Sequence, residues 1–121
     1  MRIFKNKAFH RWVKETELSD SELKEAVDEI SNGLYEANLG GNVFKKRVAL
    51  DGRGKSGGAR TIVAFRNDKH TFFVYGYAKN VRSSISEREE IVLKKLAKLY
   101  FSYSDEQLAQ AIRVGELVEV K

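Results

Sequence analysis

The chain has 121 residues, a formal net charge of +5 and no cysteine. Its length fits one domain, residues 1–121, and its 42% hydrophobic content is sufficient for a folded core. Without cysteine there can be no disulfide, thiolate metal ligand or cysteine nucleophile. No apolar run approaches the roughly 18 residues of a membrane span, and the first residues lack the apolar segment of a signal peptide. We therefore expect a soluble cytoplasmic protein that does not contact a membrane.

The first residues predict a strand and a helix. Residues 2–5 can form a short edge strand. Residues 7–14 predict a helix, because Phe9, Trp12 and Val13 recur at helical spacing. An aromatic stripe of this kind can stack nucleic-acid bases, but at this spacing it is more often part of a core.

A second helix is predicted by the capping-box spacing of Ser19 and Glu22, and Gly33 is placed to end it. Its outer face is acidic and would repel a nucleic acid, so the helix is expected to back a sheet. Residues 35–42 predict a loop.

Three antiparallel strands are predicted at residues 43–50, 59–66 and 71–79. Alternation places Lys45 and Arg47 on one face of the first strand. In the third strand the same alternation predicts that four side chains face the helices, Phe72, Val74, Gly76 and Ala78. It predicts that the other four face outward, Phe73, Tyr75, Tyr77 and Lys79. Exposed aromatic side chains between cations are typical of single-stranded RNA binding, although tyrosine also simply favours strands.

Two further capping boxes predict C-terminal helices, Ser86 with Glu89 and Ser104 with Gln107. The first helix runs to about residue 101, with an apolar face of Val92, Leu93, Leu96, Leu99 and Tyr100. Residues 116–121 can add an edge strand that binds a partner, or remain a tail. The predicted fold class is α+β, a small antiparallel sheet packed against two N-terminal helices and followed by C-terminal helices.

Positive charge is concentrated in residues 43–82, which carry ten Lys and Arg and two acidic residues. This block has a charge of +8, so the rest of the chain sums to −3. Such a block indicates a polyanionic partner, most simply a nucleic-acid backbone. The glycine-rich segment 51–58 inside the block can bring backbone N–H groups close to a phosphate, or can be an ordinary hairpin connection.

No metal-ligand set, cofactor motif or nucleophile–base arrangement stands out, and His10 and His70 lie in different predicted elements. A cluster of Lys and Arg can nevertheless cleave RNA, since cations stabilise a pentavalent phosphorane and lower the pKa of the 2′-hydroxyl. The cluster is specific for polyanion binding and not by itself for catalysis.

The run Gly54, Lys55, Gly57, Gly58 and Arg60, followed by an apolar strand and the ending Tyr77, Lys79 and Asn80, resembles toxins of the RelE/ParE superfamily. The pattern is similar to RelE- and HigB-like toxins of bacterial type II toxin–antitoxin systems over about residues 4–98. The resemblance implies a ribosome-dependent mRNA endonuclease that needs no cofactor or metal. It also implies ribosome and mRNA as targets and a cognate antitoxin, expected to be a small helix-turn-helix protein encoded nearby.

The resemblance also implies site residues. The expected catalytic residues are Lys45, Arg47, Arg60, Lys79 and Arg82. The expected RNA-binding residues are Lys46, Arg53, Lys55, Tyr75 and Tyr77. Residues 81–86 lack the tyrosine that the type member of the family has there, so the general base stays open. A ParE-like toxin that poisons gyrase and a non-catalytic RNA-binding module are the alternatives.

Overall fold

The fold is that of a computed structural model, which describes residues 1–50 and 58–121. Most of the predicted glycine-rich loop, including Arg53 and Lys55, therefore lies outside the described residues. The elements in chain order are β1 (Ile3–Asn6), α1 (Lys7–Thr16), α2 (Asp20–Ser31), β2 (Ala37–Gly40), β3 (Val43–Val48), β4 (Ala59–Ala64), β5 (Thr71–Ala78), α3 (Glu87–Phe101), α4 (Asp105–Arg113) and β6 (Leu117–Glu119). This is the predicted α+β class.

The six strands form one mixed sheet in the order β2-β3-β4-β5-β1-β6. β1 runs parallel to β5, and the other neighbouring pairs are antiparallel. Two sequence predictions need correction here. Residues 2–5 do not form an edge strand, since β1 is paired on both sides and its Phe4 is completely buried. Residues 35–42 are not only a loop, because β2 forms one edge of the sheet.

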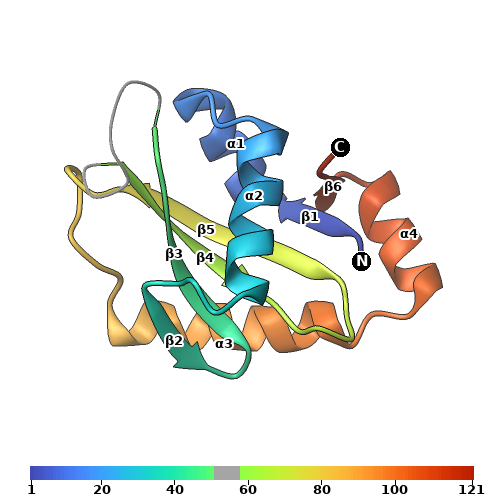
Figure 1. The fold of residues 1–121 in the computed structure, drawn as a ribbon. Coiled ribbons are helices and arrows are strands. Elements are labelled where there is room, and N and C mark those ends of the chain that lie inside the picture. Colours follow the sequence, from blue (N-terminus) through green and yellow to red (C-terminus); the bar gives the residue numbers. More distant parts are fainter. Residues whose placement is uncertain (51–57) are drawn as a thin grey trace.

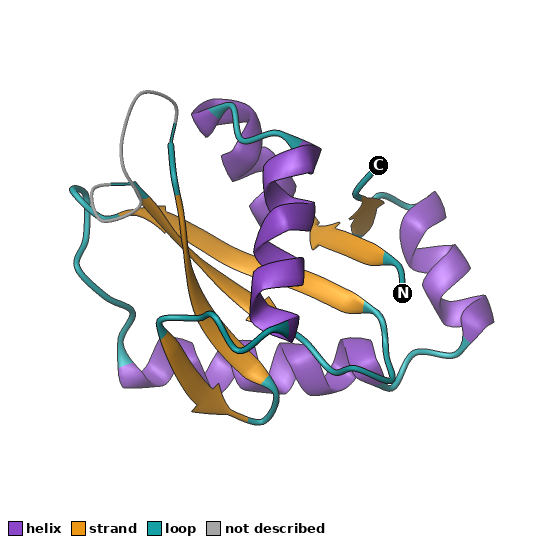
Figure 2. Cartoon of the chain, in the orientation of Figure 1, coloured by secondary structure: helices purple, strands orange, loops and turns teal. Residues whose placement is uncertain are grey.

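Helices cover both faces of the sheet. α1 and α2 lie on one face and α3 crosses the other, while α4 packs near β6 at the C-terminal end (Figure 1). The same arrangement is visible by element type in Figure 2. Phe9 and Leu23 belong to the core under α1 and α2, and Phe72 and Leu93 belong to the core under α3. The sheet is thus the middle layer between two hydrophobic cores.

The predicted capping boxes are confirmed. The hydroxyl groups of Ser19, Ser86 and Ser104 each accept a hydrogen bond from the backbone N–H three residues later. In each case the side chain at that third position bonds back to the backbone of the capping serine. These contacts fix where α2, α3 and α4 begin, and so fix the points at which the chain leaves the sheet.

A β-bulge in the β4–β5 pair reverses part of the predicted alternation. Ile62 pairs with Tyr75, but the next residue, Val63, pairs with Phe73, so Val74 is the extra residue. Phe73 therefore points toward α1, where it is completely buried and stacks on Phe9 with ring centroids 5.0 Å apart. The prediction that Phe73 faces outward was wrong, because the alternation pattern assumes an uninterrupted strand.

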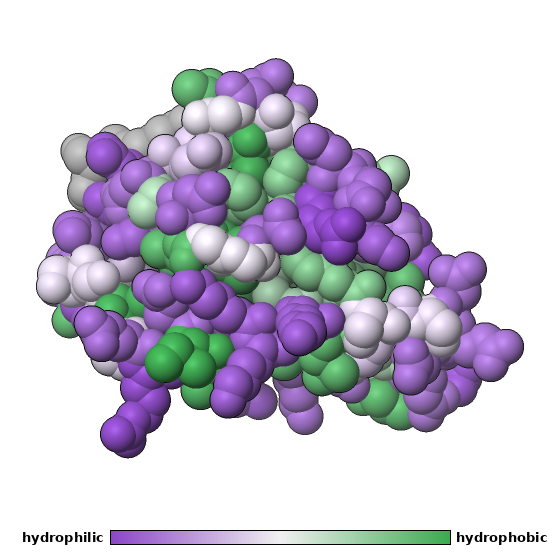
Figure 3. Space-filling model, turned by 90° about the horizontal axis from the view of Figure 1, so that it is seen from below, coloured by the Kyte–Doolittle hydropathy of each residue, from purple (hydrophilic) through white to green (hydrophobic). Residues whose placement is uncertain are grey.

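The apolar face predicted for α3 is only partly correct. Leu93 and Tyr100 are buried, as predicted, together with Ala97. Val92 and Leu99 are instead 57% and 49% exposed. Seen from below, the side on which α3 lies, the surface mixes separate hydrophobic patches with hydrophilic side chains (Figure 3). The outer side of α3 is thus an ordinary mixed surface.

The C-terminal residues form a strand and not a free tail. β6 pairs antiparallel with β1 and is the second edge of the sheet.

Within the described residues, no helix combines the length and the apolar character that crossing a membrane requires.

Candidate nucleic-acid interface

The basic residues predicted for the site come together on the face of the sheet that α3 covers only in part. Arg47 of β3 lies opposite Arg60 of β4, which in turn lies opposite Tyr77 of β5. Lys45 occupies the next row on the same face, opposite Ile62, and Tyr75 continues that row. Directly opposite side chains of neighbouring strands lie about 5 Å apart, so this register gathers three cations in a small area.

The carboxylate of Glu36 lies at the centre of these cations. Its Oε1 accepts hydrogen bonds from Arg60 Nε at 2.8 Å and from Arg47 Nε at 2.9 Å. Its Oε2 lies 3.5 Å from Lys45 Nζ. The backbone N–H of Glu36 donates to the carbonyl oxygen of Lys45 at 2.8 Å, which fixes the start of β2 beside β3. One acidic residue at the sheet edge therefore links Lys45, Arg47 and Arg60, which we call the cation trio.

Burial raises the pKa of Glu36, but the charges and hydrogen bonds of Arg60, Lys45 and Arg47 outweigh burial and hold it below its ordinary value. Glu36 is thus ionised at neutral pH. The charge matters for folding, because two arginines directly opposite each other in an antiparallel pair repel. The carboxylate between them converts this repulsion into two charge-assisted hydrogen bonds.

A second group of charged residues surrounds Arg82. Its guanidinium donates to both carboxylate oxygens of Glu89, at 2.9 and 2.6 Å, and to the hydroxyl of Tyr75 at 3.0 Å. It also lies 5.7 Å from the ring centroid of Tyr77. Tyr77 is opposite Arg60, so its ring connects this group with the cation trio. Tyr75 is only partly buried, so its ring beside Arg82 suits stacking on an unstacked base. Tyr77 is instead 4% exposed, so the prediction that it is an exposed aromatic side chain was wrong.

The charged pair fixes the protonation state of this part of the site. The hydrogen bond from Arg82 and that from the Ser86 backbone lower the pKa of Glu89 to about 2. The same carboxylate raises the pKa of Arg82 further above its ordinary value. Burial raises the pKa of Tyr77, so its hydroxyl is neutral near pH 7.

We expect the free energy of unfolding to fall as the pH is lowered from about 4.5 toward 2. The folded-state pKa values of Glu36 and Glu89 lie below the ordinary glutamate value of 4.5, so their stabilisation is present above that value and is lost as each carboxylate is protonated. Urea unfolding at a series of pH values would measure this decline. Glu89→Gln should show a shallower decline, and an unchanged slope in that variant would contradict the assignment.

Not every predicted residue joins this surface. Lys46 points to the opposite face, where it is 5% exposed and pairs with Glu29 of α2 at 2.8 Å. It is thus a contact between sheet and helix, and we leave it out of the interface. Lys79 lies just after β5 and is exposed, and its ammonium donates to the Ser83 carbonyl at 3.1 Å.

Sequence reasoning missed the two carboxylates of the site. Glu89 was predicted only as a capping residue, and it both caps α3 and binds Arg82. Glu36 is the only acidic residue between Glu29 and Asp51, a weak signal in retrospect. Its role depends on the pairing of β2 with β3, which the sequence did not predict.

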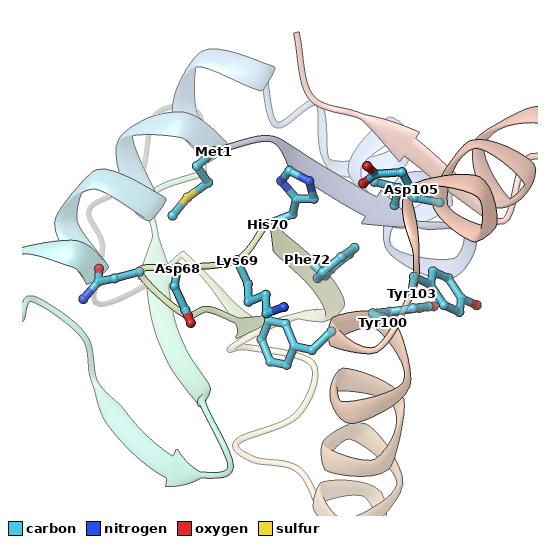
Figure 4. A pocket seen from close by; sticks show the side chains of 11 residues that line it. Met1, Asp68, Lys69, His70, Phe72, Tyr100, Tyr103 and Asp105 are labelled. Carbon is cyan, nitrogen blue, oxygen red and sulfur yellow. The ribbon is translucent and has the colours of Figure 1, made fainter.

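A separate cavity of about 390 Å³ lies elsewhere, between the N-terminus, the β4–β5 turn and the α3–α4 junction. Figure 4 shows aromatic and charged side chains around it, among them His70 and Tyr103. Burial and a hydrogen bond to Glu116 raise the pKa of Tyr103 to about 12. None of the predicted site residues lines this cavity. No group of three His, Asp or Glu side chains that could hold a metal occurs in residues 1–50 and 58–121.

The fold and the site define a small α+β domain with arginine and lysine side chains gathered on one face of its sheet. Residues 1–120 match the family described as the RelE toxin of the RelE/RelB toxin–antitoxin system. The chain belongs to this family, so it is a toxin of a toxin–antitoxin system, and the family implies an antitoxin partner. No curated protein matches the chain significantly.

Proposed function

We propose that this toxin is a ribosome-dependent mRNA endonuclease that stops translation, and that it acts in the cytoplasm. The observation that carries the proposal is the cation trio, in which Lys45, Arg47 and Arg60 converge on one anionic group. Three cations around one anion match the needs of a phosphodiester whose charge grows in the transition state. Tyr75, which is partly exposed in the row of Lys45, offers a ring for a flanking base.

In the proposed reaction the RNA 2′-oxygen attacks the adjacent phosphorus and the bond from phosphorus to the 5′-oxygen breaks. The products are a 2′,3′-cyclic phosphate and a 5′-hydroxyl. Arg47 and Arg60 stabilise the negative charge on the non-bridging oxygens. Lys45 donates a proton to the departing 5′-oxygen, and water takes the proton of the 2′-hydroxyl. Lys79 and Arg82 contact neighbouring phosphates, as do Arg53 and Lys55 in this proposal.

The family's antitoxin would silence the protein by covering this basic surface. An acidic segment is the simplest chemical complement to Arg47, which is the most exposed member of the trio, with 48% of its side chain accessible. A small helix-turn-helix protein encoded nearby remains our expectation for that partner.

Induction in a bacterial host followed by mapping of mRNA 5′ ends tests the proposed function. The wild-type chain should arrest growth and produce new 5′ ends inside translated messages. The double variant Lys45→Ala, Arg47→Ala retains the Arg60–Glu36 pair and should fold, but neither arrest growth nor cut. A translation inhibitor that empties the ribosome of mRNA should remove the cuts.

Two other outcomes of this experiment would contradict the proposed function. Growth arrest with DNA-damage signalling and intact messages would replace the proposal with a ParE-like action on gyrase. Soluble wild-type protein that binds RNA without arresting growth would leave a non-catalytic RNA-binding module.

A further inference from the structure

Glu36 occupies the place in the cation trio where an anion is expected. The three donors Arg47 Nε, Arg60 Nε and Lys45 Nζ all lie within 3.5 Å of its two carboxylate oxygens. A phosphate group offers oxygens to the same types of donor with similar distances. The protein therefore supplies its own anion at the centre of its most basic site.

We propose that Glu36 is an internal counter-anion that holds the place of a phosphate group in the free protein, and that this phosphate displaces it on binding. The phosphate is that of a single-stranded RNA chain, an identity that rests on the proposed function. Two anions in contact with the same three cations repel each other, so the carboxylate and the phosphate compete for the trio.

The position of Glu36 in the chain permits this exchange. Its backbone is held by the hydrogen bond from its N–H to the Lys45 carbonyl, so the side chain can rotate away without loss of the β2–β3 pairing. The side chain is 18% accessible and belongs to the segment that leads into an edge strand. A bound phosphate would take the place of the carboxylate between Arg47 and Arg60, so these opposed arginines of β3 and β4 would keep a counter-charge.

The protonation state of Glu36 favours this role over that of a general base. Although burial raises its pKa, Arg60 and the other two cations bring the value below the ordinary range. A weakly basic carboxylate is a poor acceptor for the 2′-hydroxyl proton at neutral pH. It is, however, fully charged, which is what a competitor of phosphate needs to be.

The exchange makes the site selective for anchored RNA. A free monoanion must displace Glu36 with no other contact to offset the loss of the Glu36 ion pairs. An RNA chain that also contacts Tyr75, Lys79 and Arg82 brings additional binding energy. Each cation released from Glu36 becomes available to neutralise a phosphate, which the salt dependence of binding reports.

Glu36→Gln tests the proposal, because glutamine keeps an oxygen acceptor for the arginines and removes the charge. The probe is a 2′-O-methyl single-stranded RNA, which cannot be cleaved, and binding is followed by fluorescence anisotropy over a salt series. We expect about tenfold tighter binding, and a plot of log affinity against log salt that is steeper by about 0.7, the value for one more neutralised phosphate on a single strand.

Glu119→Gln is the matched control. Glu119 is also a carboxylate paired with an arginine, at 2.8 Å from Arg2, but it lies on β6 at the far edge of the sheet. Both variants add the same net charge, so an equal gain in Glu119→Gln would mean a general charge effect and would overturn the proposal. Equal or weaker RNA binding by Glu36→Gln would also overturn it.

A second probe separates this proposal from the proposed function. Inorganic phosphate is titrated into each protein while the arginine Nε–H signals are followed by NMR. Glu36→Gln should bind phosphate at lower concentration than wild type, with shifts at Arg47 and Arg60. If neither protein binds RNA, the proposed function fails, and this titration still decides the role of Glu36. Equal or weaker phosphate binding by Glu36→Gln would exclude it as a counter-anion.

Discussion

Phe73→Ala should lower the free energy of unfolding by about 3–5 kcal/mol, the usual cost of removing a buried phenylalanine. Phe73 has no exposed surface, and it joins β5 to α1 through the ring of Phe9. The deletion would leave a cavity between the sheet and the helix. Because small domains are stable by only about 5–15 kcal/mol, the variant would retain a fraction of the original stability. Urea unfolding at pH 7 would measure the loss.

Val92→Ala is the informative comparison, because the sequence pattern predicted that Phe73 is exposed and Val92 is buried. The structure shows the reverse. Val92 is 57% exposed on α3, so its truncation should change the free energy of unfolding by less than about 0.5 kcal/mol. A small effect at Phe73 together with a large one at Val92 would contradict the bulge in the β4–β5 pair and the orientation of α3.

The sequence predicted structure correctly where a short motif depends only on contacts between neighbouring residues. The serine capping boxes located the starts of α2, α3 and α4, because a capping box needs only four consecutive residues. The alternation of β3 correctly placed Lys45 and Arg47 on one face. These features depend on neighbours in sequence and not on tertiary contacts.

The failures occurred where distant segments decide the structure. The parallel pairing of β1 with β5 needs a connection, residues 7–70, that spans about half of the chain, and no short pattern signals it. The bulge at Val74 moves Phe73 to the other face through a change of register with β4. For the same reason the sequence found the cations of the site but not Glu36, whose neighbours are set by the pairing of β2 with β3.

Lys46 shows how charge counting overestimates a binding surface. It belongs to the same basic run as Lys45 and Arg47, yet it is buried on the other side of the sheet against Glu29. A strand sends successive side chains to opposite faces, so a run of three cations contributes only two to one surface. The glutamates beside Arg82 and the cation trio reduce the free charge further.

Arg60→Ala should lower the rate of mRNA cleavage by about a hundredfold or more, the usual effect of removing a charged donor from a site where negative charge develops. Arg60 is the most buried member of the cation trio, with 6% of its side chain accessible, and water cannot readily replace its guanidinium. The fold should persist, because Lys45 and Arg47 still accompany Glu36. Cleavage of translated messages by purified protein, with circular dichroism to confirm folding, would measure the effect.

Two further variants make this result specific. Arg60→Lys keeps the charge but not the fork of donors that binds Glu36 through Nε, so it should recover only part of the activity. Arg66→Ala removes an arginine of the same segment, one that pairs with Asp68 beside the β4–β5 turn, and should cleave as wild type does. A folded Arg60→Ala protein with undiminished cleavage would show that the reacting phosphate does not bind at the cation trio. An equal loss in Arg66→Ala would instead indicate that total positive charge, and not the geometry around Glu36, controls the activity.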